Sequence, residues 1–573
     1  MNMNSRALPR LGAAALAWLS CVGAHAADGS FTTLTYNVAG LPQVLSSAAG
    51  DRAAATRLIS CYVKNFDIVN VQEDFNYHAE LYDSCDNHPY RSPTSGGAAV
   101  GSGLNTLSRY RYDDWDRVSW SHCNGVDCLT PKGFTLARTR LAEGVYVDVY
   151  NLHTQAQTAS ADLTARRADI QQLLAYIEAE SAGNAVVVMG DTNTRYTRDG
   201  DNMWEFLRHG FTDAWVKNVR NGSVPAVGAA AMVCEPAVTS PNCEIVDKIV
   251  YRNGAHVTLN ATGYNVQVDA KDAGGVELSD HRPVAVNWSY TLASDRRLSD
   301  TFGGPHGTSF DDASLLPASP AVRQLKIRAG ARVDRVETVL ANGYPFGHGG
   351  GGGNEQVLTL GNGEVLTRAS MCTDSYNGHT RLFSISFSTN WNRGLSGGTP
   401  TATCTTYTAP AGWAIVGFHG RSGDGVDKLG MVYAPALPNN GAAVTPMRFV
   451  NKQSGLCMDV DRANAADGSN VLQWTCNGGQ NQQWSYDATT GLVRSMLDPH
   501  YCLDNSGSYD SGANIMLRTC NGNSNQRYTF DTATGRLAVR NNPVQVVDGV
   551  AATGNVITYQ DWNGANQRWA MRP

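Results

Sequence analysis

Hydrophobic positions follow two different periods in the first 290 residues of this 573-residue chain. Apolar runs of strand length stand at residues 31–38, 66–73, 145–154 and 184–193. Between the last two runs, apolar residues recur at the spacing of one helix face over residues 161–180. Strands that alternate with a helix predict a layered α/β domain, which we place at residues 27–290.

Two stretches of different composition follow. Residues 300–434 are rich in Gly, Thr and strand-like runs and show no amphipathic helix. After a linker rich in Pro, Asn and Gly, residues 447–573 contain a repeat: Asn-Gln-Gln-Trp begins at 481, Asn-Gln-Arg-Tyr at 525 and Asn-Gln-Arg-Trp at 566. Three similar units of about 40 residues predict a threefold, all-β arrangement.

The N-terminal 26 residues have the pattern of a signal peptide. Arg6 and Arg10 precede an apolar run, and small residues end at Ala26. We therefore expect secretion after cleavage near Ala26. No later run reaches the roughly 18 apolar residues that a membrane helix needs.

Cysteine usage also favours an oxidising compartment. One of the 13 cysteines, Cys21, lies in the expected signal peptide, and an even number remains. Neighbouring positions suggest the pairs Cys61–Cys85, Cys123–Cys128, Cys234–Cys243, Cys372–Cys404, Cys457–Cys476 and Cys502–Cys520. A zinc site is the disfavoured alternative, because no pair has the short doublet spacing of tetrahedral sites.

Charge is distributed unevenly along the chain. Residues 27–290 carry 21 Lys and Arg against 30 Asp and Glu, a net charge of −9, whereas residues 291–573 carry a net charge of +1. Proteins that bind nucleic acid through its phosphates usually present a basic face. Nucleic acid is therefore a less favoured partner, and bound cations would offset part of the negative charge.

Polar residues stand at the ends of the predicted strands. In chain order they are Asn37, Glu73, His153, Asp191, Asn193, Asp247, Asp280 and His281. Each alone has an ordinary explanation, such as a turn or a solvated strand end, but the ordered series favours a single site. Hard oxygen ligands suit Mg²⁺, and a histidine oriented by a carboxylate can activate water at neutral pH.

These ordered motifs resemble the endonuclease/exonuclease/phosphatase superfamily, with its deoxyribonuclease I-like fold, over residues 30–290. The resemblance implies a four-layer α/β sandwich with two central sheets, and hydrolysis of phosphate esters with Mg²⁺ or another divalent cation. Glu73 would be the principal metal ligand, with Asn37 beside it and Asp280 close to the metal.

The same resemblance implies catalytic roles. Asp191 and Asn193 would position the nucleophile and the phosphate. His153 would stabilise the phosphate or protonate the leaving group. His281 would be the general base with Asp247 as its orienting partner, although Asp247 could exchange this role with the acid that precedes His281.

The superfamily includes nucleases, lipid phosphatases and sphingomyelinases, so the fold leaves the substrate open. Residues 123–139 resemble the loop and Lys-Gly strand of the sphingomyelinase branch, which would place Lys132 near the substrate phosphate. The alternative is a loop that is merely stapled by its two cysteines, with Lys132 in solvent. No counterpart of the aromatic membrane hairpin of some bacterial members is evident, which leaves only peripheral contact with a membrane surface.

Residues 300–434 resemble a jacalin-like lectin domain, an all-β prism, in the start at 302–312, the glycine run at 349–353 and the turn before Asp427. The resemblance implies a sugar site at Asp427, Asp424 and Gly423. The aromatic residues often found in that turn are absent.

Residues 447–573 resemble a ricin B-type β-trefoil lectin. In that fold Trp484 and Trp569 are core residues, and each sugar site combines an Asp, a stacking ring and an Asn. The first and third repeats supply Asp459, Trp474, Asn481 and Asp548, Tyr559, Asn566. The second repeat carries Arg518 in place of the ring, so we expect it to bind least.

Together these features predict a secreted, metal-dependent phosphodiesterase, most similar to sphingomyelinase C, that acts on a phospholipid headgroup and is held on glycoconjugates by two lectin domains. A secreted nuclease or other phosphoesterase is one alternative. A carbohydrate-binding, toxin-like protein with an inactive first domain is another.

Overall fold

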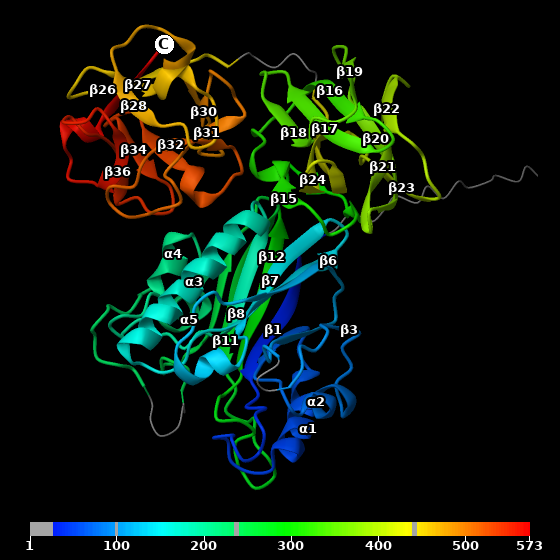
Figure 1. Ribbon diagram of the computed structural model, residues 1–573, viewed down its shortest axis with the longest axis vertical. Helices are drawn as coiled ribbons and strands as arrows, with labels where there is room; N and C mark the ends of the chain where they lie inside the picture. The colour runs from blue at the N-terminus through cyan, green and yellow to red at the C-terminus, as the bar shows by residue number, and fades with distance from the viewer. Residues whose placement is uncertain (1–26, 98–100, 234–239, 438–443) are drawn as a thin grey trace, which may run out of the picture.

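The computed structural model describes residues 27–97, 101–233, 240–437 and 444–573, which form three packed regions (Figure 1). The first is the α/β region, the second forms the lobe at the upper right of Figure 1, and the third forms the upper left lobe. The expected signal peptide and Cys234 lie outside the described residues. Within the described ranges, no helix combines the length and apolar character needed to cross a membrane.

Two sheets form the centre of the α/β region in the part of the chain that the structure describes. One has the strand order β11 (Val257–Val266), β12 (Val284–Leu292), β1 (Gly29–Asn37), β2 (Ile68–Gln72), β4 (Asn105–Ser108), β3 (Tyr90–Arg91). The other has the order β5 (Tyr112–Ser119), β6 (Gly133–Ala142), β7 (Val145–His153), β8 (Ala185–Asp191), β10 (Asp247–Arg252), β9 (Thr212–Asp213).

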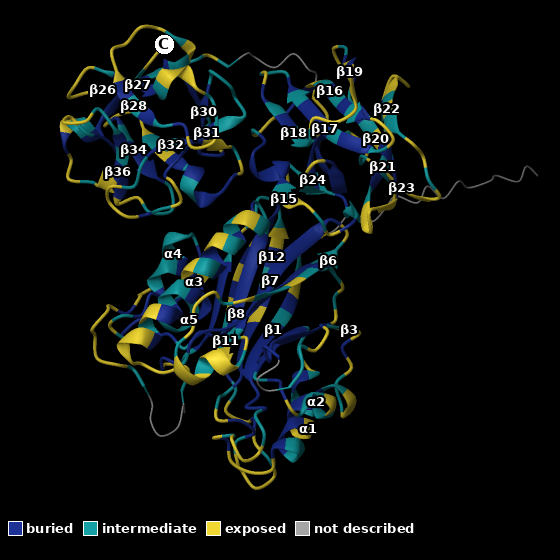
Figure 2. Ribbon diagram, viewed as in Figure 1, coloured by how far each residue is buried: buried dark blue, intermediate teal, exposed yellow. Residues whose placement is uncertain are grey.

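Helices cover the outer face of each sheet. They are α1 (Arg52–Val63), α2 (His78–Asp83), α3 (Ser160–Glu180), α4 (Trp204–Arg208) and α5 (Ala214–Val219). Side chains alternate along β8: Val187 faces the core between the sheets, whereas Val186 and Val188 pack with α3. β8 is therefore apolar on both faces, and the central strands are almost wholly buried (Figure 2). The predicted four-layer sandwich is confirmed.

The second region consists of sheets arranged as a prism around one apolar core. Their strand orders are β13 (Arg297–Leu298), β25 (Val426–Pro435), β24 (Trp413–Ser422), β15 (Thr308–Asp311), with β14 (Phe302–Gly303) on β25; β18 (Pro345–Gly349), β17 (Val333–Leu340), β16 (Val322–Ala329), β19 (Asn354–Thr359); and β22 (Gly394–Gly398), β21 (His379–Thr389), β20 (Leu366–Tyr376), β23 (Thr403–Thr408). A short 3-10 turn, η2 (Asp312–Ser314), follows β15.

The third region is the predicted threefold unit. Its sheets have the orders β28 (Val471–Trp474), β27 (Cys457–Val460), β26 (Arg448–Asn451), β37 (Trp569–Arg572); β29 (Trp484–Tyr486), β30 (Val493–Ser495), β31 (Tyr501–Asp504), β32 (Met516–Thr519); and β33 (Tyr528–Asp531), β34 (Arg536–Val539), β35 (Gln545–Gly549), β36 (Val556–Gln560). The 3-10 turns η3 (Asp461–Ala463), η4 (Gln480–Gln482), η5 (Ser524–Gln526) and η6 (Ala565–Gln567) connect strands. Trp484, Tyr528 and Trp569, one from each repeat, are fully buried in a common core, as predicted for the two tryptophans.

Polar contacts join the three regions. Arg138 of the α/β region donates to the Ser309 hydroxyl at 3.1 Å, and Lys428 pairs with Asp114. The second and third regions meet where the Tyr344 and Ser485 hydroxyls lie 2.7 Å apart. Elsewhere, where all three regions meet, a cavity of about 910 Å³ is lined by residues of α3, β15 and the second trefoil repeat.

The disulfide predictions are confirmed wherever the structure describes both cysteines. The bonds are Cys61–Cys85, Cys123–Cys128, Cys372–Cys404, Cys457–Cys476 and Cys502–Cys520. The predicted partner of Cys243, Cys234, lies outside the described residues. These bonds are typical of proteins that fold in an oxidising compartment.

Candidate active site

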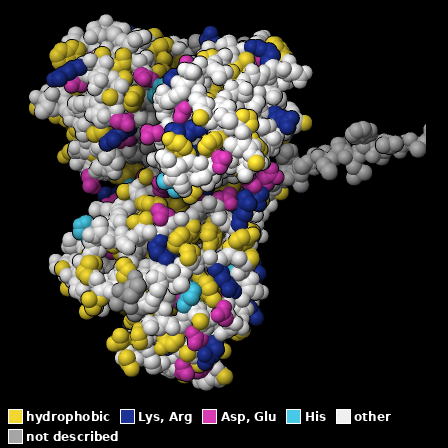
Figure 3. Space-filling view, turned by 45° about the vertical axis from the view of Figure 1, so that its right-hand side comes forward, with side chains coloured by type: hydrophobic (Ala, Val, Ile, Leu, Met, Phe, Trp, Pro, Cys, Tyr) yellow, Lys and Arg dark blue, Asp and Glu magenta, His cyan; other side chains and the backbone are white. Residues whose placement is uncertain are grey.

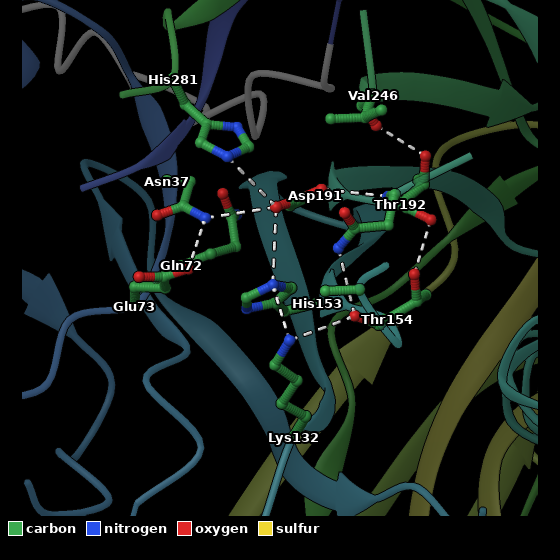
Figure 4. A network of polar contacts seen from close by, with 12 residues as sticks. Asn37, Gln72, Glu73, Lys132, His153, Thr154, Asp191, Thr192, Val246 and His281 are labelled. Carbon is green, nitrogen blue, oxygen red and sulfur yellow. Dashed lines mark hydrogen bonds and ion pairs between the residues drawn. The ribbon is translucent and has the colours of Figure 1, made fainter. Parts of the chain in front are cut away.

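The predicted strand-end residues meet at one end of the two central sheets (Figure 4). Asn37 ends β1, and Asp191 ends β8. In the neighbouring strands His153 and Asp247 both stand opposite Asp191. The pairing register therefore brings together residues far apart in sequence. Helix α3 begins near the site, shortly after His153, and ends at Glu180, which pairs with Arg421 of the second region. A helix of 21 residues is about 30 Å long, so the site lies roughly that far from the second region.

Glu73 and Asn37 form the first part of the site. Asn37 Nδ2 donates to Glu73 Oε1 at 3.0 Å and to Asp191 Oδ2 at 3.2 Å. Glu73 has a φ of 58°, a backbone conformation that residues other than glycine rarely adopt. Its carbonyl oxygen accepts a hydrogen bond from the Gly40 N–H at 3.0 Å. A Cβ on Gly40 would lie 2.2 Å from that carbonyl oxygen, so glycine is required for this close approach. Burial raises the pKa of Glu73.

His281 and Asp247 form the second part. His281 Nδ1 lies 2.9 Å from Asp247 Oδ2, and His281 Nε2 lies 3.7 Å from Asp191 Oδ2. Because an ionised carboxylate can only accept, Nδ1 carries a proton in this arrangement. Burial lowers the pKa of His281, but the Asp247 and Asp191 carboxylates outweigh it and raise the pKa well above its usual value. The partner of His281 is thus Asp247, whereas Asp280 contacts the hydroxyls of two serines.

One detail differs from the sequence interpretation. Asp280 and His281 do not open the last strand; β12 begins three residues after His281, at Val284. Pro283 has no N–H to contribute to the sheet, so the chain joins the ladder only after it. The loop leaves His281 partly exposed, with its Nδ1 edge turned to Asp247.

Lys132 and His153 form the third part. Lys132 Nζ lies 3.1 Å from His153 Nε2 and 3.0 Å from Asp127 Oδ2. Burial, together with the Lys132 charge, lowers the pKa of His153 to about 3. His153 is therefore neutral and accepts a hydrogen bond from Lys132. The placement of Lys132 beside the cluster agrees with the resemblance to the sphingomyelinase branch rather than with a solvated lysine. Nearby, Asn193 Nδ2 donates to the Thr154 carbonyl at 3.3 Å.

The acidic groups of the site fit a divalent cation. In the described part of the chain, Glu73, Asp191 and Asp247 form no ion pair with Lys or Arg. Histidine side chains lie beside the two aspartates but form no such pair with Glu73. Asp247 Oδ1 is buried and has no hydrogen-bond partner. Ligand atoms of Asp191, Asp247 and His281 lie within 4.8 Å of one another. Buried carboxylates with so little compensating charge are suited to Mg²⁺.

Two residues of the site, Asp127 and Trp120, were not predicted from the sequence. Asp127 lies in η1 (Gly125–Leu129), within the loop that the Cys123–Cys128 bond closes. Trp120 Nε1 donates to the His153 carbonyl at 2.7 Å and fixes that strand end. The Cys-x₄-Cys loop directly before Lys132 was the only sequence signal for Asp127, and no motif marks Trp120.

Exposed aliphatic side chains lie on loops beside the cluster. Val126 and Leu129 of η1 are 73% and 69% exposed. Val44 and Leu45, in the loop whose Ser47 contacts Asp280, are 89% and 67% exposed. Hydrophobic side chains reach the surface at the lower tip of the molecule, the end away from the two β regions (Figure 3). Exposed aliphatic side chains therefore lie on two described loops beside the site.

The predicted sugar sites of the trefoil are assembled in the first and third repeats. Asn481 Nδ2 donates to Asp459 Oδ2 at 2.9 Å, and Asn566 Nδ2 donates to Asp548 Oδ1 at 2.8 Å. The rings are exposed beside them, Trp474 by 60% and Tyr559 by 43%.

The second repeat keeps the same pair, since Asn525 Nδ2 donates to Asp504 Oδ2 at 2.8 Å. Arg518 stands opposite Cys502, as Trp474 stands opposite Cys457. This repeat faces the cavity between the three regions rather than open solvent.

The predicted jacalin-like site lies in the turn between β24 and β25. Gly423 and Asp424 are exposed there, whereas Asp427 is buried and pairs with Arg381 at 3.4 Å. The rings of His306 and His379, whose centroids are 3.8 Å apart, act electrostatically on Asp427. Two imidazole rings from outside this turn, one of them at the start of β21, thus lie near Asp427.

Comparisons with known proteins agree with the three regions. Residues 51–240 match Endonuclease/Exonuclease/phosphatase family 2, residues 299–432 match the Jacalin-like lectin domain, and residues 445–569 match the Ricin-type beta-trefoil lectin domain. The resemblances predicted from the sequence are confirmed.

Individual relatives cover parts of the chain. A sphingomyelinase of Mycobacterium bovis is 40% identical over 272 residues, which are 46% of this chain and 53% of the relative. A mannose/glucose-specific lectin of Parkia platycephala is 30% identical over 203 residues, 34% of this chain and 38% of the lectin. The chain thus spans about half the length of these relatives or less. The crystal structure of sphingomyelinase C from Streptomyces griseocarneus is 20% identical, covers 45% of this chain and 99% of its own, and has a TM-score of 0.35.

Proposed function

We propose that this protein is a secreted phosphodiesterase that depends on a divalent cation. Its three regions match the endonuclease/exonuclease/phosphatase, jacalin-like and ricin-type families. It hydrolyses the headgroup of a sphingomyelin-type phospholipid and binds glycoconjugates through its two lectin regions. The observation that carries the proposal is the convergence of Glu73, Asp191, His281 and Lys132 at one end of the central sheets.

The cation would be held by Glu73, with Asn37 beside it and the neighbouring aspartates close by. When bound, a divalent cation would neutralise charge on the phosphoryl oxygens and lower the pKa of His281. His281 Nε2 then takes a proton from the attacking water, while its Nδ1–H stays hydrogen-bonded to Asp247.

The other end of the site serves the phosphate. Neutral His153 orients the Lys132 ammonium, which provides the positive charge next to the phosphate and its departing oxygen. Asp191 receives hydrogen bonds from the Asn37 side chain and from the Asn193 N–H, so its carboxylate is fixed between the cation ligands and the base. Preorganised groups of this kind lower the cost of charge development in the transition state.

A secreted nuclease is the main alternative, and the mouth of the site argues against it. Duplex or single-stranded substrates need basic or aromatic surfaces along the backbone path, whereas the described loops beside the site carry Val44, Leu45, Val126 and Leu129. The second alternative, a binding protein with an inactive first region, is disfavoured because the catalytic positions are both filled and brought together.

Replacing Val126 and Leu129 with serine is expected to weaken binding to phosphatidylcholine and sphingomyelin vesicles by roughly tenfold or more, since each aliphatic side chain loses about 1.5–3 kcal/mol of burial when fully inserted. Hydrolysis of a soluble phosphodiester should stay unchanged. Vesicle co-sedimentation and a chromogenic assay measure the two effects. Val357→Ser, at an aliphatic position in the second region that is 47% exposed, is the control. Equal vesicle binding by all variants would contradict a role of these loops.

Trp474→Ala and Tyr559→Ala are each expected to lower glycan affinity by about three- to tenfold, because ring stacking contributes about 0.5–1.5 kcal/mol. The double variant should lose most trefoil binding, and phosphodiesterase activity on a soluble substrate should not change. Binding to immobilised glycans measures the effect. Trp391→Ala removes an exposed ring that is remote from the trefoil and serves as the control. A glycan-binding loss in Trp391→Ala alone would place the sugar site elsewhere.

A further inference from the structure

A second cavity lies between the α/β region and the trefoil and contains none of the catalytic or sugar-binding residues discussed above. Its volume is about 510 Å³. The α/β region contributes the loops after α3, α4 and β10, and the trefoil contributes the turns before β30, before β33 and after β34. Because α3 ends here and begins near the catalytic cluster, this cavity is separate from the candidate active site.

Four arginines line this cavity, which we call the arginine pocket: Arg252, Arg296, Arg527 and Arg540. Among the described residues of its wall the only acid is Asp295, and none is Lys or His. Arg296 pairs with Asp295 at 2.8 Å, and Arg252 pairs with Glu178, which lies outside the wall, at 2.9 Å. Two of the four positive charges are therefore compensated.

Arg527 and Arg540 carry the charge that is left. Neither forms an ion pair with an acid in the described part of the chain. Arg527 donates to three main-chain carbonyls at 2.6–3.1 Å, and Arg540 donates to three at 2.9–3.5 Å. A guanidinium has five N–H donors, so each arginine is held in place and still has donors for a ligand.

The four arginines also act on one another. Burial, together with the charges of Arg540, Arg252 and Arg296, lowers the pKa of Arg527 to about 10. Arg527 is therefore still charged at neutral pH, but it is held next to charges of the same sign. An anion in the pocket would relieve this repulsion.

The uncompensated charge selects the ligand. Two arginines without a counter-charge need two negative charges in a small group, and a phosphate monoester carries about −1.5 to −2 at neutral pH. A carboxylate carries a single charge. The planar, forked donors of arginine also match the oxygens of a phosphate.

Neutral polar side chains extend the wall beyond the arginines. Thr212, Thr489 and Asn541 line the pocket, and their side chains make no hydrogen bond within the described residues. They can therefore bond to hydroxyl groups. The one ring in the described wall, Tyr251, is buried, so a nucleobase would find no stacking surface. The volume lies within the range of small-molecule sites, roughly 300–1,000 Å³, and leaves room for a monosaccharide beside the phosphate.

We propose that the arginine pocket binds a phosphorylated monosaccharide, with the phosphate on Arg527 and Arg540 and the sugar hydroxyls on Asn541 and the two threonines. The bound ligand joins the trefoil to the α/β region, because both contribute to the wall. This site goes beyond the proposed function and does not depend on it, since no catalytic residue takes part.

Calorimetry on the purified full-length protein without Mg²⁺ tests the pocket, with glucose 6-phosphate, glucose 6-sulfate, inorganic phosphate and glucose as probes. Glucose 6-phosphate is expected to bind on the order of tenfold more tightly than the sulfate ester or free phosphate. Arg540→Gln and Arg527→Gln should each weaken glucose 6-phosphate binding by roughly tenfold or more, because each removes a charge-assisted hydrogen bond. Arg540→Lys keeps the charge but not the fork and should lose less.

Arg323→Gln removes an exposed arginine of the second region that forms no ion pair in the described chain, and it is the control that should bind like the wild type. Thermal unfolding without ligand shows whether each variant is folded. Glucose 6-phosphate should raise the unfolding temperature of the wild type more than that of Arg540→Gln. Equal glucose 6-phosphate binding by wild type and both glutamine variants would overturn the proposal. Free phosphate or glucose 6-sulfate that binds as tightly as glucose 6-phosphate would contradict the assigned ligand.

Discussion

Glu73→Gln is expected to lower kcat/KM for phosphodiester hydrolysis on the order of 10³-fold and to raise the Mg²⁺ concentration needed for half-maximal activity. The amide keeps the size of the side chain and can still bond to Asn37, but it removes the buried negative charge that would hold the cation. Each tenfold loss of rate corresponds to about 1.4 kcal/mol of transition-state stabilisation, so the expected reduction corresponds to a loss of about 4 kcal/mol. Initial rates measured across a Mg²⁺ titration provide both values.

Glu80→Gln is the control for this change, because Glu80 lies in α2 and its described ion pair is with Arg57 rather than with the site. It should leave rate and Mg²⁺ dependence unchanged. Full activity of Glu73→Gln would show that the cation is held elsewhere, for example by the Asp191, Asp247 and His281 group. Unchanged glycan binding by Glu73→Gln would show that the lectin regions remain folded.

His281→Asn is expected to reduce kcat by about 10²- to 10⁴-fold, the usual contribution of a positioned general base. Asp247→Asn should reduce kcat less, because it removes the orienting partner and leaves the imidazole. The double variant should be little worse than His281→Asn, since the two residues act as one unit. Single-turnover hydrolysis of a soluble substrate separates these effects from product release.

His500→Asn is a matched control. His500 Nδ1 lies 2.8 Å from Asp498 Oδ1, so the same kind of pair exists in the trefoil region, away from the site. This variant should keep normal activity. Additive losses in the His281 and Asp247 double variant would mean that Asp247 acts on the cation or the phosphate independently of His281.

Much of the architecture follows from local sequence patterns. Clear hydrophobic patterns in the sequence predicted the strands β1, β2, β7 and β8 and the helix α3. The patterns are clear because these elements are buried on one or both faces. The trefoil repeat was visible because each unit contributes a similar core residue, such as Trp484 or Trp569. Polar residues at strand ends predicted a common site, since neighbouring strands end at the same edge of a sheet.

The remaining features depend on contacts that local patterns do not encode. The bond from Trp120 to the His153 carbonyl and the pairing of Lys132 with Asp127 are set by the register of β5, β6 and β7 and by the closed loop before β6. The choice of Asp247 over Asp280 as partner of His281 required the position of the loop before β12. The orientation of the second trefoil repeat toward the other regions depends on how whole domains pack.

The most direct test of the account is the release of phosphocholine from sphingomyelin vesicles by the purified full-length protein, with Mg²⁺ and with an excess of chelator, beside parallel incubations with DNA and inositol phosphates. The account predicts rapid phosphocholine release with Mg²⁺, loss of that activity in chelator and its recovery when Mg²⁺ is restored, with DNA left intact. Degradation of DNA with sphingomyelin untouched, or release that the chelator does not affect, would contradict it.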